Sequence, residues 1–367
     1  MKKQIVFISS ISWDFAWHRQ QEIMFELSEK GFEILFVEPC TKNLFKSAFT
    51  KKKERIWVLT PSGLPYERVL RPINKINSLI SKKQISKTMK KIGFNNPIVW
   101  LDRVHGFDFK YFSKNSYVVY DLIDEILAFG RVRNKKMLIS LENRVLKRAD
   151  LLISSSQTLG DRKIKQCGVI DKKFEFIPNG VDINRFKIDK EWDKTKQISR
   201  PRIGFVGTIE KRRMDCVLLN TIIKRNPNWN FIFIGPHDEF VNKEITGDNV
   251  FFFERVLGDK IPEVIASFDV GIIPYLVDKQ DMDYVFPRKA CEFLASGKPV
   301  ISTPLKELVV FGEHVIVANN IDEFEKGIRT ALLKEGGEEE RKEFSKKFDW
   351  NVLLQSLIEK LQRGGRN

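Results

Sequence analysis

The chain has 367 residues, of which 42% are hydrophobic and 30% are charged, and this balance predicts a soluble globular protein with room for two domains. No run of 18 apolar residues occurs, which excludes an ordinary transmembrane helix, and the short apolar run after Lys3 fits a first strand better than a secretion signal. Four dispersed cysteines favour neither a disulfide framework nor a zinc site, and they predict a cytoplasmic protein.

The formal net charge of +15 is confined to the N-terminal half. Residues 1–165 hold 31 Lys and Arg against 16 Asp and Glu, whereas residues 166–367 hold 32 of each kind. A one-sided basic charge predicts an anionic partner, which leaves membrane lipid, a polyphosphate lipid carrier and nucleic acid as candidates. We expect peripheral contact with an anionic membrane, at the inner face of the cell membrane.

A strand–helix–strand unit opens the chain. Residues 4–9 predict a buried strand, 19–30 a helix and 32–38 a second strand, and parallel sheets bind ligands at the carboxyl ends of their strands. The loop before the helix holds His18, which is therefore a candidate catalytic residue. Trp13 and Trp17 in the same loop allow two interpretations, a hydrophobic plug or an aromatic platform for a sugar acceptor.

Two lysine-rich segments follow. Residues 42–55 mix lysines with Leu44, Phe45 and Phe49, so a helix here would suit a membrane surface, and a solvated loop is the alternative. Residues 74–92 show helical spacing and predict a helix with its lysines outside. Its core-facing residues are expected to be Ile76, Leu79, Ile80, Ile85, Met89 and Ile92.

Polar residues follow the next two predicted strands. The strand at 97–101 leads into Asp102, Arg103 and His105, and the strand at 117–121 leads into Asp124 and Glu125. These residues should share one edge of the sheet. Asp124 is a candidate catalytic carboxylate, and a helix cap is the alternative interpretation.

A second series of strands begins after a polar segment, 192–202, which is interpreted as a linker. The strand ending at Val206 leads into Gly207 and Thr208, and a glycine after a strand permits close approach of a phosphate to the backbone. Lys211, Arg212 and Arg213 lie within reach. Further strands are predicted at 229–235, 250–253 and 269–274.

The most informative stretch is residues 284–304, which predict a loop, a helix, a tight turn and a strand. Pro287 opens the helix and Gly297 closes it. A helix N-terminus suits a phosphate, and Arg288 and Lys289 place cations in the same turn. Glu292 can accept two hydrogen bonds from a ribose diol. An amphipathic helix with solvated charges is the alternative.

A metal site is not expected. Asp281-Met282-Asp283 imitates a metal-binding DxD motif. We predict neither a metal nor another cofactor for this chain.

Residues 284–304, IPNGVD at 177–182 and RADLLISSS at 148–156 resemble the retaining GT-B glycosyltransferases of family 4 (group 1). The tryptophan-containing loop and YDLIDE at 120–125 resemble a teichuronic-acid-type, surface-polysaccharide subgroup. The resemblance implies two Rossmann-like domains facing a cleft. Residues 1–182 with a returning C-terminal helix, 346–367, would bind the acceptor, and 200–345 would bind the donor.

The resemblance also implies roles for individual residues. Glu292 would hold the nucleotide ribose, and the helix start at Pro287, Arg288 and Lys289 would hold the diphosphate. The family's arginine after Gly207 is Thr208 here and its lysine falls on Arg213, so Lys211 or Arg212 would supply a missing charge. Arg255 and Val256 begin the segment that holds the base. The family's first glutamate falls on Tyr284, at the donor sugar. Asp124 matches the aspartate of a His-Asp pair.

The function that follows is a metal-independent, retaining hexosyltransferase. It would move a sugar from a nucleotide-sugar, with UDP expected, to a lipid-linked or polysaccharide acceptor in bacterial cell-surface polysaccharide synthesis, with His18 or Asp124 positioning the acceptor hydroxyl. Tyr284 and Thr208 keep open a non-catalytic partner subunit. Two further candidate functions are a nucleotide-sugar epimerase, which shares the fold, and a nucleic-acid binder, which the basic charge would suit.

Overall fold

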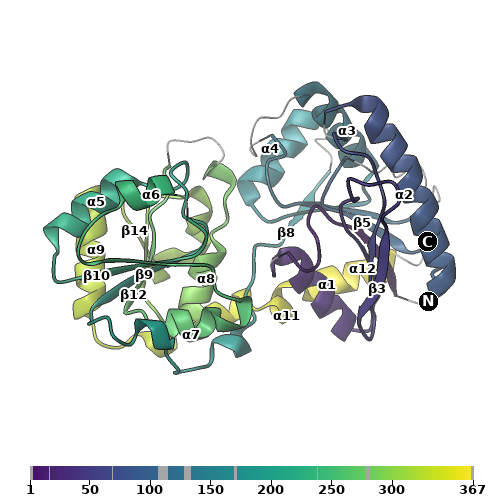
Figure 1. The fold of residues 1–367 in the computed structure, drawn as a ribbon. Coiled ribbons are helices and arrows are strands. Elements are labelled where there is room, and N and C mark those ends of the chain that lie inside the picture. Colours follow the sequence, from purple (N-terminus) through teal and green to yellow (C-terminus); the bar gives the residue numbers. More distant parts are fainter. Residues whose placement is uncertain are drawn as a thin grey trace. The chain divides into compact units, whose positions relative to one another are not determined.

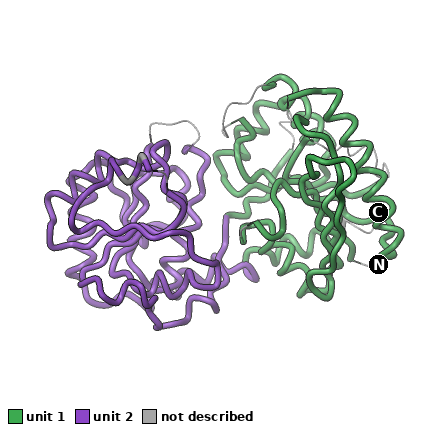
Figure 2. The backbone as a smooth tube through the Cα atoms, in the orientation of Figure 1, with its two compact units in different colours: residues 1–178, 353–367 green, residues 179–352 purple. Residues whose placement is uncertain are grey.

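The computed structural model describes residues 3–15, 17–67, 69–105, 115–127, 134–168, 172–237, 239–277 and 282–364. The chain forms two compact α/β units, shown in Figure 2. Unit 1 comprises residues 1–178 and 353–367, and unit 2 comprises residues 179–352. The sequence placed the end of the first domain at 182 and the start of the returning C-terminal segment at 346, each within a few residues of the structural boundaries. It placed the start of the second domain at 200, whereas unit 2 begins at Asn179.

Unit 1 is built on an eight-stranded sheet with the order β3-β4-β2-β1-β5-β6-β7-β8, parallel except for the β3–β4 pair. Its inner strands are buried on both faces, as apolar runs such as QIVFI require. The strands are β1 (Gln4–Ile8), β2 (Glu33–Val37), β3 (Ala48–Lys53), β4 (Ile56–Thr60), β5 (Ile98–Leu101), β6 (Val118–Leu122), β7 (Leu151–Ser154) and β8 (Phe174–Phe176). The helices are α1 (Arg19–Glu29), α2 (Arg71–Ile92), α3 (Lys135–Arg148), α4 (Gln157–Cys167) and α12 (Gln355–Gly364).

Unit 2 has a six-stranded, all-parallel sheet with the order β11-β10-β9-β12-β13-β14, and Figure 1 shows helices on both of its faces. The strands are β9 (Arg202–Val206), β10 (Asn230–Ile234), β11 (Val250–Phe253), β12 (Val270–Ile273), β13 (Val300–Ser302) and β14 (Val315–Val317). The helices are α5 (Cys216–Arg225), α6 (Glu239–Glu244), α7 (Ile261–Ala266), α8 (Arg288–Ala295), α9 (Ile321–Leu333) and α10 (Glu338–Ser345), while α11 (Trp350–Leu353) ends where unit 1 resumes.

Each sheet reverses its strand order at one place. In unit 1 the chain runs outward from β1 to β2 on one side and from β5 to β6 on the other, and in unit 2 the reversal lies between β9 and β12. Parallel sheets bind ligands outside the carboxyl ends of the strands at such reversals. The candidate ligand sites are therefore the carboxyl ends of β1 and β5 in unit 1 and those of β9 and β12 in unit 2.

The segment 42–55 is not a helix. Residues Ala48–Lys53 form the edge strand β3, antiparallel to β4. Its lysines lie over aromatic rings of neighbouring elements, with Lys51 Nζ 5.4 Å from the Trp57 ring centroid and Lys53 Nζ 5.7 Å from that of Phe25. Lysines on an edge strand discourage pairing with another chain, which explains the composition without a membrane helix.

Helix α2 forms where expected, but a different face of it is buried. Ile85 is buried as predicted, whereas Ile76 and Leu79 are exposed. The other buried residues are polar and lie one helical turn apart: Asn74, Asn77, Ser78, Ser81 and Thr88. Asn77 accepts from the Leu64 amide at 2.8 Å, and Gln84 accepts from the Ser62 amide at 3.0 Å. The helix thus packs on irregular backbone that needs polar partners.

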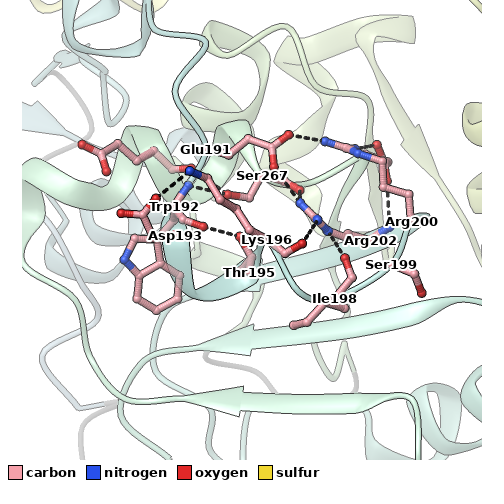
Figure 3. Close-up of polar contacts among 12 residues, drawn as sticks. Glu191, Trp192, Asp193, Thr195, Lys196, Ile198, Ser199, Arg200, Arg202 and Ser267 are labelled. Atoms are coloured by element: carbon pink, nitrogen blue, oxygen red, sulfur yellow. Dashed lines mark hydrogen bonds and ion pairs between the residues drawn. The ribbon is translucent and has the colours of Figure 1, made fainter.

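The polar segment 192–202 is not a free linker. Trp192 donates its amide to Ser267 Oγ at 2.9 Å, and Arg202 pairs with Glu191 at 2.8 Å while its Nε donates to Ile198 O at 2.7 Å, as Figure 3 shows. Arg200 also pairs with Asp269, which precedes β12. These contacts bind the segment to the amino-terminal edge of the unit 2 sheet.

The final helix, α12, belongs to unit 1, as the family resemblance implied. Leu357 and Leu361 are buried, and Lys360 pairs with Glu175 beside β8. None of the helices in the described ranges is both long and apolar enough to cross a bilayer.

A buried charge cluster joins three elements of unit 1. Lys163 on α4 is fully buried, and its Nζ lies 2.7 Å from both Glu125 Oε1 and Glu142 Oε2. Tyr120 donates to the second oxygen of Glu142 at 3.2 Å. Burial raises the pKa of Glu142, and the Lys163 ammonium opposes that rise. Lys163 therefore pairs with two buried carboxylates, and Arg162, whose Nε lies 3.8 Å from Glu125 Oε2, adds a second cation.

The Lys163→Met variant should lose about 3–5 kcal/mol of folding free energy, because it removes the buried cation that pairs with both Glu125 and Glu142. Urea unfolding measures the loss. Lys165→Met, on the exposed side of the same helix, is the matched control and should change stability little. Equal stability of the two variants would show that the cluster is not a structural requirement.

Candidate functional site

In unit 2, two glycine turns meet at the carboxyl ends of neighbouring strands. Gly207 follows β9 with φ +144°, and Gly235 follows β10 with φ +142°. The Gly207 amide donates to Ile234 O at 2.8 Å, and a Cβ on Gly235 would lie 2.1 Å from Gly207 O. Only glycine fits this backbone-to-backbone contact. The turns leave main chain, rather than side chains, lining the edge of the sheet.

Lys289, in the first turn of α8, crosses directly over the Gly207 turn. A Cβ on Gly207 would lie 2.5 Å from Lys289 Cε. The ammonium sits 5.2 Å from the Phe205 ring centroid and 5.6 Å from that of Tyr275, and no carboxylate among the described residues pairs with it. Aromatic faces hold a cation in place without neutralising it. The arrangement presents a positive charge beside exposed backbone.

The basic trio after Gly207 divides into two kinds. Lys211 pairs with Glu244 at 2.9 Å and Arg212 with Glu210 at 2.5 Å, both at the surface. Arg213 is half-buried, and the described residues offer its guanidinium no carboxylate. Its carbonyl accepts from the Leu276 amide at 2.8 Å, next to the ring that underlies Lys289. Arg213 is thus the member of the trio whose positive charge is not paired with a described carboxylate.

Helix α8 starts after Pro287, as the sequence predicted. Arg288 Nε lies 2.9 Å from Glu292 Oε1, one turn along, and both side chains are largely buried. This pair orients the Glu292 carboxylate beside the first turn of the helix. Tyr284 lies in the preceding 3₁₀ turn and is buried.

The remaining unit 2 candidates lie around this position. Thr208 is exposed directly after Gly207, and Arg255 is exposed beside the half-buried Val256, in the loop that follows β11. Asp281 of the DxD-like string lies outside the described residues, and Asp283 pairs with Lys306 at 2.9 Å. No group of His, Cys, Asp and Glu in the described parts of the chain is arranged to hold a metal ion.

In unit 1 the strand reversal carries a buried carboxylate. Asp102 follows β5, and its Oδ2 accepts from Ser10 Oγ at 2.9 Å and from Gln20 Nε2 at 3.0 Å. Its Oδ1 is buried and has no hydrogen-bond partner within the described structure. Desolvation raises the pKa of Asp102 to about 7, although both hydrogen bonds oppose the rise. The group therefore titrates near neutral pH.

A second carboxylate, Asp121 at the end of β6, serves a different purpose. Arg19 contacts it through two nitrogens, each at 3.3 Å, and also donates to the carbonyls of Ile177 and Pro178 at 2.7 and 3.0 Å. All these groups are buried. Arg19 thus ties the start of α1 to the last residues of unit 1, and Asp121 balances its charge.

The sequence candidates of unit 1 lie on the surface at this same edge. His18 is exposed at the N-terminus of α1, where its amide donates to Gln21 Oε1 at 3.1 Å and its ring stacks on Phe15. Asp124 is exposed, two residues beyond β6. Trp13 is buried, with its ring centroid 5.5 Å from that of Trp17 and 5.1 Å from that of Phe36. The plug interpretation is correct for Trp13.

Asp102 was predicted to lie at the polar edge of the sheet but was not among the candidate catalytic residues. The signal was present, because a carboxylate immediately after a buried strand must lie at the functional edge of a parallel sheet. What the sequence lacked was the strand order, which alone places Asp102 at the reversal next to Ser10.

Sequence comparison shows that this chain is similar to known glycosyltransferases. The family model described as "Glycosyl transferases group 1" matches residues 200–334. The putative teichuronic acid biosynthesis glycosyltransferase TuaH of Bacillus subtilis (strain 168) is 27% identical over 246 residues, which cover 61% of this chain. The match spans 59% of that relative's own length.

Solved structures show the fold. A sucrose-phosphate synthase from Thermosynechococcus elongatus superposes with a TM-score of 0.75 at 13% identity, over 99% of both chains. An Escherichia coli structure titled as trehalose-6-phosphate bound with UDP-2-fluoro glucose gives 0.71 at 13% identity, over 98% of this chain and 99% of that one. The chain therefore has the GT-B fold, and the comparisons together support the group 1 glycosyltransferase family.

The Asp102→Asn variant should flatten part of the pH dependence of stability. The folded-state pKa of about 7 lies above the unfolded value of about 3.9, so ionised Asp102 destabilises only the folded state. As pH rises from about 4 to about 7, the wild type should lose stability relative to the variant, on the order of 4 kcal/mol, and no more above that range. Urea unfolding at several pH values tests this, and parallel curves for the two proteins would contradict it.

Proposed function

We propose that this GT-B chain of the group 1 glycosyltransferases moves a sugar, with retention and without a metal, from a nucleotide-sugar to a lipid-linked or polysaccharide acceptor of the bacterial cell surface. The observation that carries the proposal is the Lys289 ammonium held over the Gly207 turn. It lies inside the segment that matches the family model. The relative's printed name favours a surface-polysaccharide acceptor.

The donor diphosphate would bind at the Gly207 turn. Its departure develops negative charge, which must be stabilised by groups already in position. Lys289 and Arg213 are cations that no described carboxylate neutralises, and the positive end of the α8 dipole points the same way. Lys211 is a weaker candidate because Glu244 already holds it.

The nucleoside would bind beside α8. Glu292, oriented by Arg288, can accept hydrogen bonds from the ribose diol, and the loop at Arg255 and Val256 would contact the base. UDP is the nucleotide we expect, since an Escherichia coli neighbour of the same fold carries UDP-2-fluoro glucose in its title. Tyr284 would contact the sugar in place of the family's glutamate, with a hydroxyl in place of a charge.

The acceptor would bind at the β1–β5 edge of unit 1. His18 and Asp124 are exposed there and can position an acceptor hydroxyl, while Asp102 lies beneath, hydrogen-bonded to Ser10 and Gln20. In the retaining mechanism that we propose, the leaving phosphate takes the acceptor proton. No protein nucleophile is then required.

Calorimetric titration of UDP and GDP in EDTA, followed by transfer assays on polyprenyl-linked saccharides, tests the function. We expect UDP to bind with a dissociation constant in the micromolar range, unaffected by EDTA, and the product to keep the donor's anomeric configuration. Binding without turnover would favour a non-catalytic partner subunit, to which the exposed Thr208 and buried Tyr284 would point. Failure to bind either nucleotide would refute the donor site.

Truncated ligands separate the roles of the donor residues. Lys289→Gln and Arg213→Gln should weaken both UDP and pyrophosphate by about tenfold or more, since each removes a charge from the diphosphate. Glu292→Ala should weaken UDP by a similar factor and leave pyrophosphate unchanged. Lys211→Gln is the comparison variant, with a smaller expected effect. Equal losses for pyrophosphate in all four variants would exclude this division of roles.

A further inference from the structure

Helix α2 exposes apolar side chains together with lysines on its solvent-facing side. Its 22 residues hold Arg71 and six lysines, and no acidic residue. Ile76 and Leu79 are 42% and 54% exposed, on the same side of the helix as Lys75, Lys83 and Lys87. Positions 76, 79, 83 and 87 are three or four residues apart, so they form one continuous stripe. We call this stripe, with Lys75, the outer face of α2.

The opposite side of the helix makes the polar contacts that leave the outer face exposed. Asn77 and Gln84 satisfy the backbone of residues 62–64, and Asn77 also donates to Glu67 at 2.9 Å. Small buried residues such as Ser78 and Ser81 allow that close approach. The helix is therefore held in register by its polar side, and the two apolar residues remain outside in consequence.

A third exposed hydrophobic residue, Phe45, lies on a loop attached to residues 61–63. Phe45 is 97% exposed, beside Lys46. Its loop is joined to residues 61–63 through hydrogen bonds from the Thr41 amide to Pro61 O at 2.7 Å and from the Gly63 amide to Asn43 O at 3.4 Å. The segment that α2 holds thus also holds a loop with a large exposed ring.

We propose that the outer face of α2, with Phe45, docks unit 1 on an anionic lipid membrane. Apolar side chains would enter the boundary between headgroups and acyl chains, and the surrounding lysines would contact lipid phosphates. Charge alone would also suit nucleic acid, but a phosphate backbone offers nothing to Ile76, Leu79 and Phe45. The proposal places the protein where a lipid-linked acceptor lies, although the surface exists independently of the donor site.

Vesicle sedimentation of the full chain tests the surface. We expect binding to vesicles of phosphatidylglycerol and phosphatidylcholine in equal parts, and none to phosphatidylcholine alone. The variants Phe45→Ser with Ile76→Ser and Leu79→Ser, and separately Lys83→Glu with Lys87→Glu, should each lower the partition coefficient by about tenfold or more. All these side chains are exposed, so urea midpoints should stay unchanged.

Control variants lie on and just after α9 in unit 2, where Leu333→Ser, and Lys326→Glu with Lys334→Glu, change residues that are also exposed. They should bind vesicles as the wild type does, and so should Lys289→Gln, which separates this surface from the proposed donor site. Undiminished vesicle binding by the apolar triple variant would overturn the proposal. So would a wild-type dimer that this variant dissociates without vesicles, or binding to RNA in preference to vesicles.

Discussion

The contact between the Gly207 and Gly235 turns is the constraint on which the proposed donor site in unit 2 depends. Backbone touches backbone there, so two neighbouring strands end without side chains at the functional edge of the sheet. That space is what allows Lys289 to cross over the turn and come to rest on Phe205 and Tyr275. A side chain at either glycine would displace the lysine or separate the strands.

The two units handle buried charge in different ways. In unit 2, Lys289 pairs with no described carboxylate and lies against two aromatic rings, which leaves its positive charge available to a ligand. In unit 1 the buried charges are mostly compensated, as Lys163 is by two glutamates and Arg19 by Asp121. Asp102 is the exception, because burial without a cation moves its pKa toward neutrality.

The lysines of the N-terminal half have different structural roles, which composition alone does not distinguish. The lysines of β3 protect a sheet edge and lie over aromatic rings. Those of α2 surround exposed apolar residues, because the helix turns its polar side to the irregular segment at 61–67. Similar sequences thus serve an edge strand in one case and a candidate docking face in the other.

The family resemblance implied the return of the last helix to unit 1. The sequence by itself determined the order of most strands and helices and the α8 segment with Pro287, Lys289 and Glu292. These follow from local periodicity, caps and glycine positions, which act over a few residues. Only the tertiary structure decided that Lys289 crosses Gly207, that Asp102 lies beside Ser10, and that Asn77 rather than Ile76 faces inward. Those outcomes depend on which distant segments become neighbours, since burial and pKa are properties of the surroundings and not of the residue.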